Sequence, residues 1–121
     1  MSGIAFEKSK ALAIRIVKAY SFLRIVKKEY VMSKQLLRCG TSIGANLAEA
    51  ECAVSKGDFL SKIYIALNET AETLYWLELL HETNYLNDSQ YASLYADSDE
   101  IRRILSATTK TLRPPSRSPT K

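Results

Sequence analysis

The 121-residue sequence is poor in residues that interrupt helices and in residues that build catalytic or metal sites. Its three prolines, Pro114, Pro115 and Pro119, all lie near the end, so no proline breaks a helix between Glu7 and Arg113. It contains four glycines and a single histidine. No stretch approaches the roughly eighteen uncharged residues of a membrane-spanning helix. These scarcities favour an all-α protein outside the membrane.

Cysteine is also scarce, and the two present cannot form a disulfide within one helix. Cys39 and Cys52 lie on one predicted helix, about 20 Å apart at the helical rise of 1.5 Å per residue. We expect both to be small buried residues of a cytosolic protein and not a disulfide pair. The charged residues Glu7, Lys8 and Lys10 precede any long apolar run, so we expect no signal peptide and a cytoplasmic location.

Apolar residues spaced alternately by three and four predict four helices, over residues 5–30, 33–54, 56–83 and 89–112. Ser33 is a plausible N-cap of the second helix, and Ser55 with Asp58 resembles a capping box for the third. Asn87 or Asp88 caps the fourth. Because the connections are short, we predict an up-down-up-down antiparallel four-helix bundle, in one domain over residues 1–112. Residues 113–121, rich in Pro, Ser and Arg, are expected to form a disordered basic tail.

Each predicted helix has a row of residues expected to face the core. The rows are Leu12, Ile16, Ala19, Leu23, Val26 and Tyr30; Leu36, Cys39, Ile43, Leu47, Ala50 and Val54; Phe59, Ile63, Ala66, Thr70, Thr73, Leu77 and Leu80; and Tyr91, Leu94, Ile101, Leu105, Thr108 and Leu112.

The second predicted helix has small residues at a spacing of four: Gly40, Gly44 and Ala48. Each glycine costs about 1 kcal/mol of helix propensity relative to alanine, so close approach of another helix is the simplest reason for two of them. Asn46 and Glu49 lie in the same turns. They form either a polar pair that fixes register between helices or subunits, or a contact for a ligand or partner.

The net charge of +4 conceals a strong polarity along the chain. Residues 1–45 hold nine basic and two acidic residues, residues 46–100 hold two and eleven, and residues 101–121 hold six basic residues and no acid. We therefore expect the neighbouring first and fourth helices to form a basic flank, with an acidic flank on the third helix. The basic flank is either a nucleic-acid surface, a solvated face or half of a subunit contact. Basic-to-acidic association of copies closes into a ring or continues as a filament.

No set of residues predicts catalysis, a metal site or a cofactor. His81, near the end of the third helix, is expected to interact with the helix dipole. Glu78 and His81 match a di-iron Glu-x-x-His motif only once, where two copies and further glutamates are needed. The glycines lie inside a helix and not in a phosphate-binding loop, and Ser42 has no nearby histidine. Tyrosines and Trp76 are expected to anchor the core or interfaces, with base stacking as the alternative for an exposed tyrosine.

Two stretches resemble a known family. Residues 42–50 (Ser-Ile-Gly-Ala-Asn-Leu-Ala-Glu-Ala) and 58–68 (Asp-Phe-Leu-Ser-Lys-Ile-Tyr-Ile-Ala-Leu-Asn) resemble the four-helix bundle family that is also called the 23S rRNA intervening-sequence protein family. The matching positions are Ser42, Ile43, Asn46, Ala48, Glu49, Phe59, Ile65 and Ala66. The resemblance covers about residues 8–112. Ala50 departs from it, since the family usually has glycine there.

The resemblance implies a non-enzymatic bundle that assembles as a ring, commonly a pentamer. Some members are encoded within intervening sequences of ribosomal RNA genes. Similar proteins are accessory factors of diversity-generating retroelements, in which a basic ring binds nucleic acid and the reverse transcriptase.

We therefore expect a homo-oligomeric accessory protein that binds RNA or an RNA–protein complex, most concretely with a retroelement reverse transcriptase. The alternative is a structural or regulatory scaffold of the same family without nucleic-acid binding. The expected contacts are Lys10, Arg15, Lys18, Arg24, Lys28, Arg102, Arg103, Lys110, Arg113 and Arg117.

Overall fold

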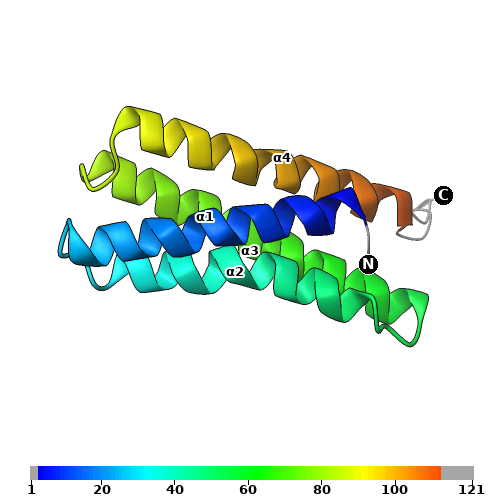
Figure 1. Ribbon diagram of the computed structural model, residues 1–121. Helices are drawn as coiled ribbons and strands as arrows, with labels where there is room; N and C mark the ends of the chain where they lie inside the picture. The colour runs from blue at the N-terminus through cyan, green and yellow to red at the C-terminus, as the bar shows by residue number, and fades with distance from the viewer. Residues whose placement is uncertain (1–2, 113–121) are drawn as a thin grey trace.

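A computed structural model describes residues 3–112 as four long helices. They are α1 (Ile4–Ile25), α2 (Met32–Ala50), α3 (Lys56–Glu82) and α4 (Asp88–Leu112). The helices lie side by side with alternating direction, and α1 begins at the end of the bundle where α4 ends (Figure 1). Each helix contacts two others, α1 with α2 and α4, and α3 with α2 and α4. The predicted up-down-up-down bundle is confirmed. The expected tail, residues 113–121, lies outside the described residues.

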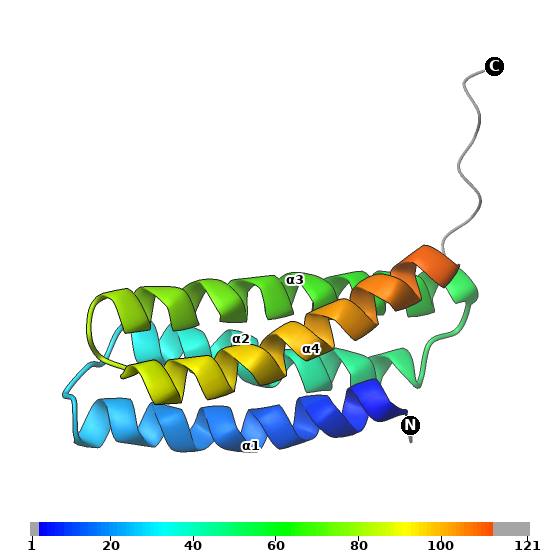
Figure 2. The same ribbon diagram turned by 90° about the horizontal axis from the view of Figure 1, so that it is seen from above.

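The core follows the predicted rows through the middle of every helix. α4 runs obliquely to α1, and the α1–α4 contact is the least extensive of the four (Figure 2). None of the helices within residues 3–112 combines the length and apolarity needed to cross a bilayer. The largest fully buried side chains include Leu12, Ile16, Leu23, Leu36, Ile43, Leu47, Leu77, Leu80, Ile101 and Leu105.

Two helices end earlier than predicted, and the last residues of their rows are exposed. α1 ends at Ile25, and Val26 and Tyr30 are 62% and 50% exposed, not part of the core. Lys28 has a φ of 59°, and the amide of Glu29 donates to the Leu23 carbonyl at 2.9 Å, which turns the chain toward α2. α2 likewise ends at Ala50, and Val54 is 92% exposed. The apolar periodicity of the sequence therefore continues beyond the residues at which α1 and α2 end.

The cap of α2 differs from the prediction, whereas the other two caps are confirmed. Ser33 is buried inside α2 and is not its N-cap. The predicted Ser55 cap is present, since its hydroxyl accepts from the amide of Asp58 at 3.0 Å. At the start of α4, Asn87 accepts from the amide of Gln90 at 2.8 Å, and Gln90 accepts from the amide of Asn87 at 2.9 Å.

Two of the three small residues of α2, Gly40 and Gly44, lie where this helix approaches α1 closely. Gly40 and Gly44 are buried, against Ile16 and Ser9 of α1 respectively. The close approach predicted from the two glycines is therefore present in the structure. Ala48, the third small residue, is exposed, and its role in an interface stays a prediction.

Candidate nucleic-acid interface

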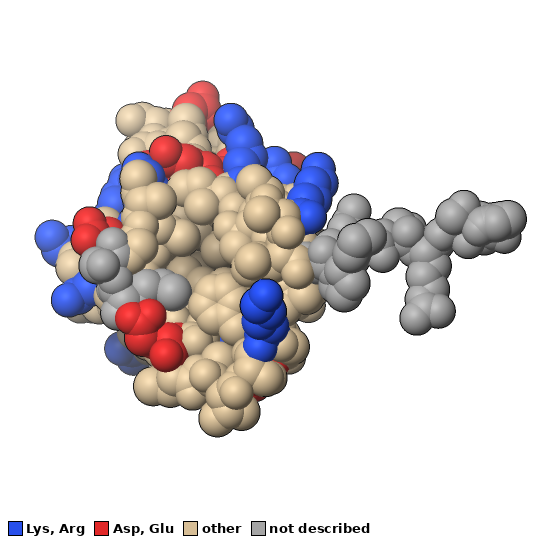
Figure 3. All heavy atoms as spheres, turned by 90° about the vertical axis from the view of Figure 1, so that its right-hand side faces the viewer, with Lys and Arg blue, Asp and Glu red and all other residues tan. Residues whose placement is uncertain are grey.

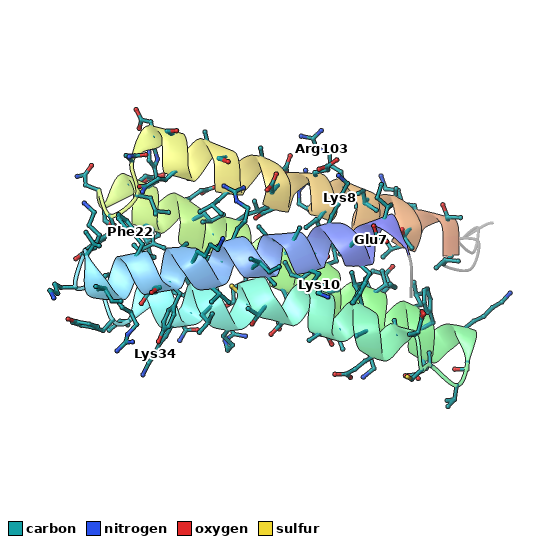
Figure 4. The ribbon with its side chains drawn as sticks, viewed as in Figure 1. Glu7, Lys8, Lys10, Phe22, Lys34 and Arg103 are labelled. Atoms are coloured by element: carbon teal, nitrogen blue, oxygen red, sulfur yellow. The ribbon has the colours of Figure 1, made fainter. Side chains whose placement is uncertain are left out.

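The side of the bundle formed by α1 and α4 carries matched charges of both signs. Lys8 of α1 pairs with Glu100 of α4 at 3.2 Å. Arg15 donates to Asp97 at 2.6 Å and to the hydroxyl of Ser93 at 2.8 Å. Figure 4 shows Lys8 and Arg103 on this side. The basic flank expected on α1 and α4 is therefore partly neutralised, because acidic residues of α4 pair with Lys8 and Arg15 of α1.

The arginines of α4 are paired within their own helix. Arg102 and Arg103 donate to the two carboxylate oxygens of Asp99, at 2.8 and 2.6 Å. The hydrogen bonds from Arg103 and then Arg102 hold the pKa of Asp99 below its usual range. Asp99 lies one helical turn before these arginines. The segment charges counted from the sequence are divided at residue 100, so Asp99 and the arginines that it neutralises fall in different segments.

The α2–α3 side is also compensated. Arg38 pairs with Glu72 and, at 3.4 Å, with Glu69. The indole of Trp76 donates to Glu72 at 3.1 Å. These bonds, first from Arg38 and then from Trp76, lower the pKa of Glu72. The predicted acidic flank on α3 is therefore partly neutralised by α2.

Asn46 and Glu49, the polar residues of the family motif, have separate partners. The Asn46 amide donates to the Ser42 carbonyl of its own helix at 2.8 Å. Glu49 pairs with Lys62 of α3 at 3.0 Å, and its side chain remains largely exposed. Glu49 therefore links α2 to α3, while Asn46 bonds along its own helix.

The only acid between Glu7 and Glu49 is Glu29, and its carboxylate is fully engaged. It accepts from the backbone amides of Val31, Met32 and Ser33, at 3.1, 2.9 and 2.7 Å. Burial by itself raises the pKa of Glu29, but the bonds from Met32, Ser33 and Val31 outweigh it, and the pKa lies below 4.5. Glu29 thus takes the role of N-cap for α2, and its ionised carboxylate is held by backbone amides and forms no ion pair with a lysine among residues 3–112.

Six exposed cations of α1, α2 and the turn between them have no ionic partner among residues 3–112. We call them the α1–α2 cationic surface; Lys18 lies at its α4 edge, where it lines a hollow with Gln90 and Leu94. The guanidinium of Arg24 lies over two aromatic rings, 5.5 Å from the centroid of Tyr20 and 5.9 Å from that of Tyr30. Lys34 projects outward from the first turn of α2 (Figure 4). The six are Lys10, Lys18, Arg24, Lys27, Lys28 and Lys34.

Four of the ten predicted nucleic-acid contacts belong to this surface: Lys10, Lys18, Arg24 and Lys28. Arg15, Arg102 and Arg103 are in ion pairs, and Lys110 is exposed near the end of α4. Arg113 and Arg117 lie outside the described residues. Lys27 and Lys34 were missed, although the near absence of acids between residues 8 and 48 was a signal that could have found them.

The opposite end of the bundle differs in chemistry. Figure 3 shows this end, where α1 begins and α4 ends, as a mainly uncharged surface that a few charged side chains of both signs interrupt and border. A hollow there includes Ala50, Ala53, Val54, Phe59 and Leu112 in its lining. An anionic ligand therefore has more complementary charge at the α1–α2 turn than on the visible part of this end.

The histidine and the two cysteines lie outside the cationic surface. His81 lies 2.7 Å from Asp88 and stacks on the ring of Tyr91 with centroids 4.2 Å apart. Cys39 is buried as predicted, which raises its thiol pKa to about 11. The burial predicted for Cys52 is wrong, because α2 ends at Ala50 and Cys52 is exposed beyond it. Residues 3–112 contain no cluster of three His, Cys, Asp or Glu side chains arranged to hold a metal ion.

Comparison with known proteins places the chain in a family. Residues 2–107 match the family described as 23S rRNA-intervening sequence protein. A crystal structure of a protein with unknown function, from the S23 ribosomal protein family of Bacteroides thetaiotaomicron VPI-5482, superposes with a TM-score of 0.87. The two are 52% identical, over 88% of this chain and 99% of that one. No curated protein matches. The chain belongs to the 23S rRNA-intervening sequence protein family, also called the S23 ribosomal protein family.

Proposed function

We propose that this protein is a non-enzymatic, homo-oligomeric accessory protein that binds nucleic acid, preferably RNA, through its α1–α2 cationic surface. The supporting observation is the distribution of charge after folding. Six cations remain without an ionic partner among the described residues, and the one acid in their stretch of sequence caps a helix. Such a surface attracts phosphates and releases their counterions, with little dependence on base sequence.

Exposed apolar residues support self-association. Ile14 and Val17 of α1 are 51% and 49% exposed. On α3, Tyr64, Ile65 and Tyr75 are also exposed. Contact between unlike faces of successive copies would bury both sets, and such contacts close into rings when the rotation permits. A ring, with the pentamer that the family resemblance implies, would repeat the cationic surface and strengthen binding through multivalency.

The most concrete form of this role is a cytoplasmic accessory factor for the reverse transcriptase of a diversity-generating retroelement. The support is the family resemblance together with the cationic surface. In this role the protein would hold template RNA near the polymerase and perform no chemistry itself.

A structural scaffold is the second candidate, because the same cations can pair with acidic residues that are exposed on a neighbouring copy. In that arrangement the α1–α2 cationic surface would meet the acidic end of α3, including Glu78 and Glu82, on the next copy. Nucleic acid would then find the cations occupied.

Binding to a labelled structured RNA, measured by anisotropy at about 50 and 200 mM salt, tests the proposal. We expect micromolar or tighter affinity that falls steeply with salt, and the slope estimates the number of phosphates engaged. Light scattering of the same sample gives the number of copies. Absence of binding at low salt, with an oligomer present, would reject nucleic-acid binding in favour of the scaffold.

A further inference from the structure

Aromatic rings and unpaired cations meet at the turn between α1 and α2. Tyr20 and Tyr30 flank the guanidinium of Arg24, and Tyr30 is 50% exposed. Lys27, Lys28 and Lys34 are exposed around the same turn. We call Arg24, Lys27, Lys28, Tyr30 and Lys34 the turn surface; Lys27 lies at its edge, where it lines a hollow with Asp88 of the neighbouring α3–α4 turn. The turn surface combines cations without ionic partners, which can bind phosphates, with an exposed aromatic ring. On the α1–α4 and α2–α3 sides, by contrast, several of the cations are in ion pairs.

The turn is held in place by its own backbone. Lys28 adopts the left-handed conformation, and the amide of Glu29 donates to the Leu23 carbonyl. The Glu29 carboxylate binds three amides of the following helix, and the Ser33 hydroxyl donates to the Glu29 carbonyl at 2.9 Å. A ligand therefore meets a surface that is already formed, and little conformational freedom is lost on binding.

We propose that the turn surface binds unpaired nucleotides, with a base stacked on Tyr30 and phosphates on Arg24 and the lysines. This inference rests on the proposed function and adds the class of nucleic acid recognised. Bases in a duplex are stacked on one another and offer no free face to a tyrosine, whereas unpaired bases stack on exposed aromatic rings. The single-stranded regions of a structured RNA are therefore the preferred ligand.

An anionic membrane is the other surface that lysines beside apolar residues can contact, and Ile25, Val26 and Val31 are exposed near the turn. The observations favour nucleic acid. The aromatic residue of the turn is already arranged with an arginine, as in single-strand binding sites. Tyrosine also occurs at membrane interfaces, so binding to anionic vesicles is one of the outcomes of the test.

The test compares a short, unstructured, labelled oligouridylate with an RNA duplex of equal length, using anisotropy and the full chain. We expect wild-type protein to prefer the single strand. Tyr30→Ser should weaken single-strand binding about fivefold or more and leave duplex binding unchanged. Tyr30→Phe, which keeps the ring, should retain the affinity. Val54→Ser is the control, because it removes an exposed apolar side chain at the opposite end of the bundle, away from both the turn and the proposed subunit contact.

The charge contribution is tested with a second pair of variants. Lys27→Gln with Lys34→Gln should lower single-strand affinity and reduce the salt slope by about 1.4. Lys56→Gln with Lys62→Gln removes the same charge from α3, away from the turn and from every predicted nucleic-acid contact, and should leave the slope unchanged. Circular dichroism and light scattering verify that each variant keeps its fold and its oligomeric state.

The outcomes separate this inference from the proposed function. Wild-type protein that binds neither RNA rejects both. Binding to duplex and single strand alike, with no effect of Tyr30→Ser, overturns the turn surface while nucleic-acid binding stands. Two further results overturn the inference: a smaller oligomer in the Lys27/Lys34 variant, which makes the turn a subunit contact, or Tyr30-dependent binding to phosphatidylserine vesicles without single-strand binding.

Discussion

Gly40 of α2 lies directly against Ile16 of α1. A Cβ atom at position 40 would stand 2.9 Å from both Cγ1 and Cγ2 of Ile16, closer than carbon atoms approach in packed proteins. Ile16 is fully buried and branched at Cβ, so it has little freedom to move aside. At Gly44 the corresponding distance to the Cβ of Ser9 is 3.6 Å, an ordinary contact.

These two glycines should therefore respond oppositely to the same substitution. Gly40→Ala should destabilise the protein by about 1–2 kcal/mol, since overpacking outweighs the gain in helix propensity. Gly44→Ala should be neutral or stabilising by up to about 1 kcal/mol. Chemical denaturation of both variants checks this. Destabilisation by both, to a similar extent, would show that α1 and α2 are closer at Gly44 than described.

The sequence predicts the centre of the fold well because helix periodicity and burial agree there. Leu12, Ile16 and Leu23 recur at helical spacing and are all buried. Periodicity fails at helix ends, where Val26 and Val54 continue the pattern but are exposed. At the end of α1 the left-handed residue is Lys28, not the glycine or asparagine that usually marks such a position. The end was therefore not visible in the sequence.

The candidate site was only partly predictable, because ion pairing depends on which helix faces meet. The excess of cations over acids before residue 46 correctly indicated cations without partners, including Lys10 and Lys18. Arg15 was indistinguishable from them in the sequence. It pairs with Asp97 only because α1 packs against α4.

Glu29 should make the stability of the bundle depend on pH. Because its pKa is lower in the folded protein than the usual 4.5, its contribution is present above about pH 4.5 and is lost as pH falls through the folded value. Glu29→Gln should cost about 1–2 kcal/mol at pH 7, as for the loss of a helix cap. The difference between wild type and variant should shrink in acid.

Denaturation measured from pH 7 to about pH 3 tests this dependence. Glu7→Gln is the control, since Glu7 is an exposed acid in the first turn of α1. A difference between wild type and Glu29→Gln that stays constant over this range would contradict the role of the ionised carboxylate.

Lys28→Gly should separate stability from binding. The left-handed backbone at position 28 is costly for lysine and free of strain for glycine, so the variant should be more stable by up to about 1 kcal/mol. The lost charge should weaken RNA binding and reduce its salt slope by about 0.7 to 0.9. Thermal melting and anisotropy measure the two effects. Lys27→Gly, where no positive φ is relieved, should lose charge without gaining stability.

The ion pairs of Asp99 with Arg102 and Arg103 should limit the contribution of these two arginines to RNA binding. Arg102→Ala with Arg103→Ala should reduce affinity less than Lys27→Gln with Lys34→Gln, because Asp99 already offsets part of the removed charge. Exposed pairs at these spacings contribute little to folding, so the stability cost should be below about 1 kcal/mol. Asp99→Asn should act in the opposite direction and raise RNA affinity, about twofold, by freeing both guanidinium groups. Anisotropy at low salt ranks the three variants. A larger loss from the arginine pair than from the lysine pair would move the main contact from the α1–α2 turn to α4.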